Sequence, residues 1–284
     1  MPRRLTWLDV FTSRPLTGNG LAVVHHADGI EDATMLAFAR ETKLSETTFV
    51  QTATEAGADY RNRIWTVVGE LPFAGHPSLG TAVAVASARD ERNAHYVQQT
   101  GAGLQPIDVE LGSSGVARAS MLQEPAVFGP EVEPGRVLAA LGLDPADGHS
   151  ELPPQVVSTG NPMLVVPVDE AATLSRVRPQ AALLDELLGE LGTVCAYVAW
   201  HDPDHDAAEA RSYFMTGELV AEDPATGSAA GPLCAYLHER TGAARVDIAQ
   251  GVAMGRPSRL LCEAGERVRV AGDVVLLAEG EIDL

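Results

Sequence analysis

The chain of 284 residues lacks several features that mark common classes of protein. It has no apolar run near the roughly 18 residues that a membrane-spanning helix needs. The basic start, MPRRLTWLDVF, is not followed by an apolar segment, which predicts no signal peptide. Cysteine occurs only at Cys195, Cys234 and Cys262, without CxxC spacing. We therefore expect reduced cysteines in the core of a cytoplasmic protein.

Signatures of nucleotide and cofactor sites are also missing. No GxGxxG follows an expected strand and no P-loop signature occurs, so the usual phosphate-binding loops are absent. Lys43 is the only lysine, and it lies in a polar stretch where a Schiff base to pyridoxal phosphate is not expected. His201 and His205 lie in an acidic loop without the spacing of metal ligands. We expect no cofactor and no metal, so the chain's own side chains must perform any chemistry.

Positive charge is scarce, with 20 Lys and Arg against 39 Asp and Glu and a net charge of −19. Such a chain repels phosphate backbones and anionic lipids, so we expect neither a nucleic acid nor a membrane as partner. A hydrophobic content of 45% is typical of globular proteins. The length fits one large domain or two smaller ones.

Two pairs of segments recur in the same order and at nearly the same spacing. TGNGLAVV at 17–24 resembles TGNPMLVV at 159–166, and HPSLGTA at 76–82 resembles DPATGSA at 223–229. Such self-similarity predicts two halves built on one plan. The expected first half is residues 1–117 plus 272–284, and the second is residues 118–271.

Each half is expected to contain the same elements: a strand, the TGN turn, an apolar strand, a helix, two strands and an alanine-rich helix. Because helices and strands alternate without strict βαβ order, the predicted fold class is α+β. The first helix of each half is expected at 32–42 and 179–189. A hairpin about Gly272 and Asp273 is expected near the C-terminus.

The starts of the two alanine-rich helices carry the strongest chemical signal. His76 and Asp223 each precede a proline and are expected near the N-caps. Free backbone N–H groups at such starts can hold a carboxylate or an enolate-like intermediate. Either motif alone is more typical of an ordinary cap, but its duplication favours a functional site.

Glu46 lies where an expected helix ends and a strand begins, among apolar neighbours. A carboxyl group held in a cleft tends towards a raised pKa and can accept a proton and return it elsewhere. The alternative is a surface glutamate that simply begins a strand.

Several segments together resemble the PhzF-like family of phenazine-biosynthesis isomerases. The resemblance covers nearly the whole chain. It rests on DVFT at 9–12, GN at 18–19, LSETTF at 44–49, GELPFAGHP at 69–77, EDPATGSA at 222–229, QG at 250–251 and MGRPS at 254–258. It implies a diaminopimelate-epimerase-like fold with two pseudo-repeated halves, each a curled mixed sheet around a central helix, and an active site between them. It further implies a homodimer without a cofactor. The chain departs from the family pattern at 65–68 and at 214–222.

The resemblance also assigns roles to residues. It implies that Glu46 is the acid and base, that His76, Asp223 and Ser228 assist it, and that the substrate is a small acidic molecule. The substrate-binding candidates are Ser45, Gly75, Gly227 and Asn19.

These observations predict an isomerase that moves a proton between carbons of a small carboxylate-bearing metabolite by general acid and base catalysis. A racemase or epimerase that uses carboxylates, and a non-catalytic binding protein on the same scaffold, remain as alternatives. A two-thiol racemase is disfavoured because neither helix start contains a cysteine, unless Cys195 faces the site.

Overall fold

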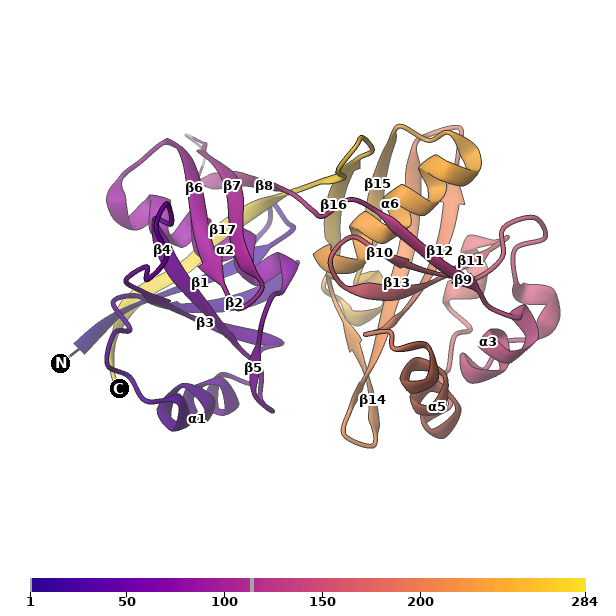
Figure 1. Cartoon of the computed structure of the whole chain (residues 1–284), viewed down its shortest axis with the longest axis horizontal. Helices are drawn as coiled ribbons and strands as arrows, with labels where there is room; N and C mark the ends of the chain where they lie inside the picture. Colours follow the sequence, from indigo (N-terminus) through magenta and orange to yellow (C-terminus); the bar gives the residue numbers. More distant parts are fainter. Residues whose placement is uncertain (1, 113–114) are drawn as a thin grey trace. The chain divides into compact units, whose positions relative to one another are not determined.

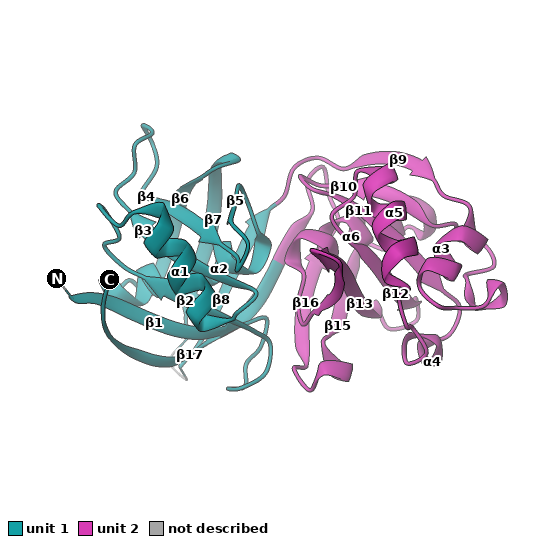
Figure 2. Ribbon diagram, turned by 90° about the horizontal axis from the view of Figure 1, so that it is seen from below, with its two compact units in different colours: residues 1–122, 271–284 teal, residues 123–270 magenta. Residues whose placement is uncertain are grey.

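The computed structural model describes residues 2–112 and 115–284. The chain divides into two compact units (Figure 2). Unit 1 comprises residues 1–122 and 271–284, and unit 2 comprises residues 123–270. These limits lie a few residues from the expected boundaries. Within the described ranges, no helix is long and apolar enough to cross a membrane.

Unit 1 is a closed sheet around one helix (Figure 1). Its strands pair in the circular order β1, β2, β3, β4, β6, β7, β8, β17 and back to β1, and only β2–β3 and β4–β6 are described as parallel pairs. Its elements are β1 (Pro2–Val10), β2 (Asn19–Val24), α1 (Asp32–Thr42), β3 (Glu46–Gln51), β4 (Tyr60–Trp65), β5 (Glu70–Leu71), α2 (Gly75–Arg89), β6 (Asn93–Thr100), β7 (Gly103–Leu111), β8 (Val116–Leu122) and most of β17 (Arg269–Asp283).

The central helix α2 is buried on all sides because its side chains are small or apolar. Every residue from Gly75 to Ala86 is buried. A helix that is apolar all round belongs inside a core. Gly80 lets the sheet approach closely, since a Cβ there would lie 2.6 Å from Cδ2 of Leu21. This packing fixes the N-terminal end of α2 against the first strands of the unit.

Unit 2 repeats this plan around α6. Its strands pair in the order β9, β10, β11, β12, β13, β15 and β16, and β11–β12 is parallel, as is β2–β3 in unit 1. Its elements are β9 (Val127–Glu131), α3 (Pro134–Ala140), η1 (Pro145–Asp147), β10 (Gln155–Ser158), β11 (Pro162–Val168), α4 (Ala171–Leu174), α5 (Ala181–Leu191), β12 (Ala196–Asp202), β13 (Ala207–Thr216), β14 (Leu219–Asp223), α6 (Gly227–Thr241), β15 (Arg245–Gln250), η2 (Val252–Met254) and β16 (Ser258–Glu263). The expected α+β class with two pseudo-repeated halves is confirmed.

The expected hairpin about Gly272 and Asp273 is wrong. β17 runs without a break from Arg269 to Asp283. Gly272 does not have a positive φ. A Cβ at Gly272 would lie 2.3 Å from Cδ1 of Phe11, so the absent side chain makes room for an aromatic ring and not for a turn. A Gly-Asp pair can thus lie inside a continuous strand, where the glycine allows close packing.

Candidate active site

Three of the expected site residues meet in unit 1. Asn19 begins β2, Glu46 begins β3, and His76 is the second residue of α2. β2 and β3 are adjacent parallel strands in which Leu21 lies level with Glu46. The start of the buried helix therefore faces the starts of two neighbouring strands. Gly75 is the first residue of the same helix, and Ser45 immediately precedes β3.

The side chains of this group are mostly buried and close to one another. Nε2 of His76 lies 3.5 Å from Oε2 of Glu46, with 4% and 15% of the two side chains exposed. The side-chain amide nitrogen of Asn19 donates to Nδ1 of His76 at 3.2 Å. An imidazole whose Nδ1 accepts a hydrogen bond carries its proton on Nε2, the atom that faces Glu46.

His76 is a neutral group in this environment. Burial lowers its pKa to about 3, and a backbone contact with Gly20 only partly opposes this effect. A neutral imidazole next to Glu46 can orient the carboxylate or donate a hydrogen bond to a bound molecule without adding a charge. His76 lies near the N-cap as expected, since the N-cap is Ala74 and His76 is the second residue of the helix.

Asp223 is the last residue of β14 and not the N-cap of α6, so that expectation is wrong. The N-cap is Thr226, because β14 extends through Asp223 and three residues then separate the strand from the helix. Thr226 Oγ1 donates to Oδ2 of Asp223 at 2.6 Å. Asp223 is therefore held by the loop before the helix.

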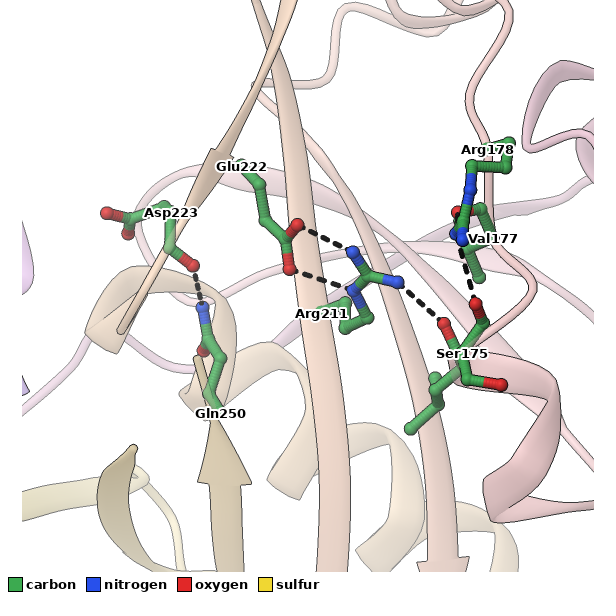
Figure 3. A network of polar contacts seen from close by, with 8 residues as sticks. Ser175, Val177, Arg178, Arg211, Glu222, Asp223 and Gln250 are labelled. Carbon is green, nitrogen blue, oxygen red and sulfur yellow. Dashed lines mark hydrogen bonds and ion pairs between the residues drawn. The ribbon is translucent and has the colours of Figure 1, made fainter. Parts of the chain in front are cut away.

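Gln250 orders this loop and was given no role from the sequence, although the QG motif contributed to the resemblance. It is fully buried at the end of β15. Its amide nitrogen donates to the carbonyl oxygen of Asp223 at 2.8 Å (Figure 3) and to Thr226 Oγ1 at 3.0 Å. Its oxygen accepts from the backbone N–H of Thr226 and from the hydroxyl of Tyr197. These hydrogen bonds show that Gln250 holds the loop, which the QG motif alone did not reveal.

The helix starts correct the register of the internal repeat. α2 begins at Gly75 and α6 begins at Gly227, and each follows a short strand and a proline. His76 thus corresponds to Ser228, and the motifs ELPFAGH and EDPATGS match. The expected pairing of His76 with Asp223 is wrong. Both residues precede a proline, and aligning the two prolines shifted the segments by five residues. Gly227 contributes its carbonyl oxygen, which accepts from the Gln123 side chain at 2.8 Å.

Cys195 occupies the place in unit 2 that Glu46 has in unit 1. In the parallel pair β11–β12, Leu164 lies level with Ala196, which places Cys195 level with Met163. The Cys195 thiol is 2% exposed, its sulfur lies 3.4 Å from that of Met163, and burial raises its pKa to about 12. A thiol with this pKa stays protonated at neutral pH.

Metal-ligand clusters are not found in this part of the molecule or elsewhere in residues 2–112 and 115–284. No group of three or more His, Cys, Asp or Glu side chains there could hold a metal ion. The arrangement of Glu46, His76 and Asn19 is suited instead to proton transfer by side chains.

Comparison with known proteins identifies the family. The family model described as phenazine biosynthesis-like protein matches residues 8–280. The chain belongs to the phenazine biosynthesis-like protein family. It is 36% identical to trans-2,3-dihydro-3-hydroxyanthranilate isomerase of Pseudomonas aeruginosa and 35% identical to the enzyme of the same name from Pseudomonas chlororaphis, in each case over 98% of both chains. The chain is an isomerase of this family.

Solved structures extend the comparison to the fold. A protein of Pseudomonas aeruginosa described as a predicted epimerase is 40% identical over 99% of each chain, with a TM-score of 0.87. A hydroxyproline epimerase from Agrobacterium vitis is only 12% identical over 99% of this chain and 92% of its own, with a TM-score of 0.64. The isomerase family therefore shares its fold with amino-acid epimerases.

Proposed function

We propose that this isomerase moves a proton between two carbons of a small cyclic carboxylate like trans-2,3-dihydro-3-hydroxyanthranilate, the compound in the name of its relatives. The single observation that carries the proposal is the contact between Glu46 and His76. It puts a mostly buried carboxylate beside a neutral imidazole at the start of a buried helix. Nothing but side-chain acid and base chemistry is needed for such a shift.

Glu46 is the proposed base. It removes a proton from a carbon whose carbanion is stabilised by a conjugated system, and as the resulting acid it returns the proton to a second carbon. His76, oriented by Asn19, donates a hydrogen bond from Nε2 and helps to hold the substrate. Backbone N–H groups near Gly75 and Ser45 are suited to bind the substrate carboxylate, since the N-terminus of a helix favours an anion.

Asp223 and Ser228 are the proposed contribution of unit 2. Asp223 exchanges protons with the nitrogen or oxygen atoms of the substrate, and Ser228 with Gly227 at the start of α6 holds its polar groups. Residues that act as a unit are strongly non-additive, so Glu46→Gln and Asp223→Asn together should lower the rate little more than the worse of the two alone.

The experiment that tests the proposal is turnover of trans-2,3-dihydro-3-hydroxyanthranilate in deuterium oxide by the wild type and Glu46→Gln. We expect Glu46→Gln still to bind the substrate, while its kcat falls by at least about a thousandfold. Deuterium from the solvent should then no longer appear in the product. Glu41→Gln, an exposed glutamate on the preceding helix, is the matched control and should turn over normally. Normal turnover by Glu46→Gln would refute Glu46 as the base, whereas binding without turnover by the wild type would favour a binding protein.

An epimerase that uses the same carboxylates is the second candidate. The 40% identical protein described as a predicted epimerase favours it. An epimerase returns the proton to the carbon that lost it, whereas the proposed isomerase returns it to another carbon. Chiral chromatography and NMR of the product separate the two, because only epimerisation preserves the double-bond positions.

We further propose a homodimer in the cytoplasm, in line with the resemblance and with a low cysteine content. Light scattering after gel filtration should give a mass near twice 29.9 kDa. A mass that stays at that of one chain over a hundredfold range of concentration would contradict the dimer.

A further inference from the structure

A hydrogen bond between two threonines joins β3 to α2 inside unit 1. The hydroxyl oxygens of Thr48 and Thr81 lie 2.8 Å apart, and 33 residues of chain separate the two positions. Both residues are fully buried, and a hydrogen bond in such a dry environment is stronger than the same bond in water. The bond is therefore a tertiary contact between the strand that carries Glu46 and the helix that carries His76.

This hydrogen bond lies next to the contact between Glu46 and His76. Along β3, Thr48 follows Glu46 by two residues, so the two side chains leave the same face of the strand. This step is about 6.6 Å long, and the step from His76 to Thr81 along α2 is about 7.5 Å long. Both contacts thus join the same strand to the same helix at similar distances from their starts. The hydrogen bond sets the separation of β3 and α2 beside the proposed base.

Unit 2, which the structure describes throughout, lacks this bond although it repeats the plan of unit 1. With β12 matched to β3 as above, Tyr197 corresponds to Thr48. With the starts of α6 and α2 matched, Leu233 corresponds to Thr81. Leucine has no hydroxyl, and the hydroxyl of Tyr197 donates to Gln250 instead. The plan therefore folds without a polar link between this strand and this helix, and the link occurs in the unit that holds the carboxylate and the imidazole.

We propose that Thr48 and Thr81 are positioning residues of the isomerase. Their hydrogen bond holds β3 and α2 at the separation at which Glu46 and His76 are in contact. This role rests on the proposed function, in which Glu46 is the base. Two methyl groups in place of the hydroxyls would meet at about 3.5–4.0 Å and not at 2.8 Å. The strand would then lie about 1 Å further from the helix, and a shift of that size can lower a rate about a hundredfold.

A second pair of threonines on the other face of β3, the control pair, provides a matched comparison. Thr47 Oγ1 lies 2.8 Å from Oγ1 of Thr42, the last residue of α1. Thr47 is fully buried, like Thr48. Because neighbouring residues of a strand point to opposite faces, this bond joins β3 to α1 and not to α2. Its loss removes the same chemical group from the same strand without loosening the strand from α2.

Valine and serine variants separate positioning from stability. The double variant with Thr48→Val and Thr81→Val leaves no buried hydroxyl without a partner, so its Tm should stay near that of the wild type. Its kcat for trans-2,3-dihydro-3-hydroxyanthranilate should fall by about tenfold to a hundredfold, with KM changed by less than about threefold. Thr48→Ser keeps the hydroxyl but loses a buried methyl group, so it should have a lower Tm and a nearly normal kcat. A pair with a merely structural role cannot give opposite orders of stability and activity.

The ring N–H proton of His76 gives a readout that needs no turnover. Because the contact with Glu46 is buried, this proton should give a separate downfield signal in NMR of protein with ¹⁵N-labelled histidine. Its absence in His76→Ala assigns the signal. The double variant should shift the signal or lose it by exchange with water, since the contact with Glu46 opens. Valine at both positions of the control pair should leave the signal and kcat unchanged.

Three results would each overturn the proposal: a wild-type kcat in the double variant, an equal loss of kcat when the control pair is replaced by valine, or an unshifted His76 signal. Failure of the proposed function has a different outcome. Glu46→Gln would then turn over normally, or the wild type would not convert the substrate at all. In either case the His76 signal alone still decides whether the bond between β3 and α2 holds the contact.

Discussion

Nε2 of His76 lies 3.5 Å from Oε2 of Glu46. In the chain, His76 lies 57 residues after Asn19, the third member of the group, and Glu46 lies 27 residues after it. The contact forms because a helix made mostly of small side chains fills the centre of unit 1 and brings His76 to the start of β3. His76 is therefore neutral and fixed, while Glu46 retains a small exposed area. This relationship leads to the first prediction.

His76→Ala should lower kcat by about a hundredfold to a thousandfold, because Glu46 loses the group that orients it. In the wild type, titration of His76 should not change the rate near pH 6.5, since its pKa is about 3. Steady-state kinetics between pH 5 and 9 measure both effects. His95→Ala, an exposed histidine, should behave like the wild type.

Two buried histidines should make stability depend on pH. Burial lowers the pKa of His76 to about 3, and burial with nearby Arg4 lowers that of His25 to about 4. The unfolded chain protonates both near pH 6.5, so it binds more protons than the native state below that pH. Stability is fully present above pH 6.5 and falls towards pH 4, by about 1.4 kcal/mol per pH unit for each histidine.

Urea unfolding from pH 7.5 to 4.5 measures this slope. His25→Asn should reduce the slope of the free energy of unfolding against pH by the contribution of about one proton. His95→Asn should leave the contribution of His25 unchanged. A His25→Asn variant with the slope of the wild type would show that His25 does not contribute.

Gln250 should position Asp223 through the loop before α6. In Gln250→Glu the carboxylate cannot donate to the Asp223 carbonyl or Thr226 Oγ1, and it adds a negative charge near Asp223. We expect kcat to fall by about 10- to 100-fold with a smaller change in KM, because geometry and not contact area is lost. Thr226→Val, which removes the bond to Oδ2 of Asp223, should shift kcat in the same direction.

Gln98→Glu is the matched control for Gln250→Glu. Gln98 is also fully buried and bonded to a tyrosine and an asparagine, but in unit 1. Both variants should lose stability, and only Gln250→Glu should lose activity beyond what its folded fraction explains. Equal kcat values for the two folded variants would show that Gln250 stabilises the fold and does not position Asp223.

Gly272→Ala should destabilise the protein by about 1–3 kcal/mol, because the new methyl group overlaps the ring of Phe11. Gly280→Ala lies in the same strand with open space around its Cβ and should change stability by less than about 0.5 kcal/mol. Chemical denaturation compares the two. Phe11→Leu added to Gly272→Ala should recover part of the loss, and an additive double variant would contradict the proposed overlap.

The sequence by itself determined the duplicated plan and the α+β class, and it supplied the candidate residues of the site. The TGN turns and the glycines at both helix starts are local signals, because turn and helix-start chemistry depends on neighbours in the chain. The position of Glu46 between an expected helix and strand made it a candidate, and the family motifs gave it a role and added Ser228.

Only the tertiary structure decided the register of the repeat, the place of Asp223 at a strand end, and the continuous course of β17. It also revealed Gln250 and the buried hydroxyl pair between β3 and α2. The physical reason is that these features depend on partners far away in the chain: Gly272 reads as a turn until Phe11 is packed against it. A glycine in a turn and a glycine that leaves space for a neighbouring side chain have similar local sequence preferences, and only the packing distinguishes them.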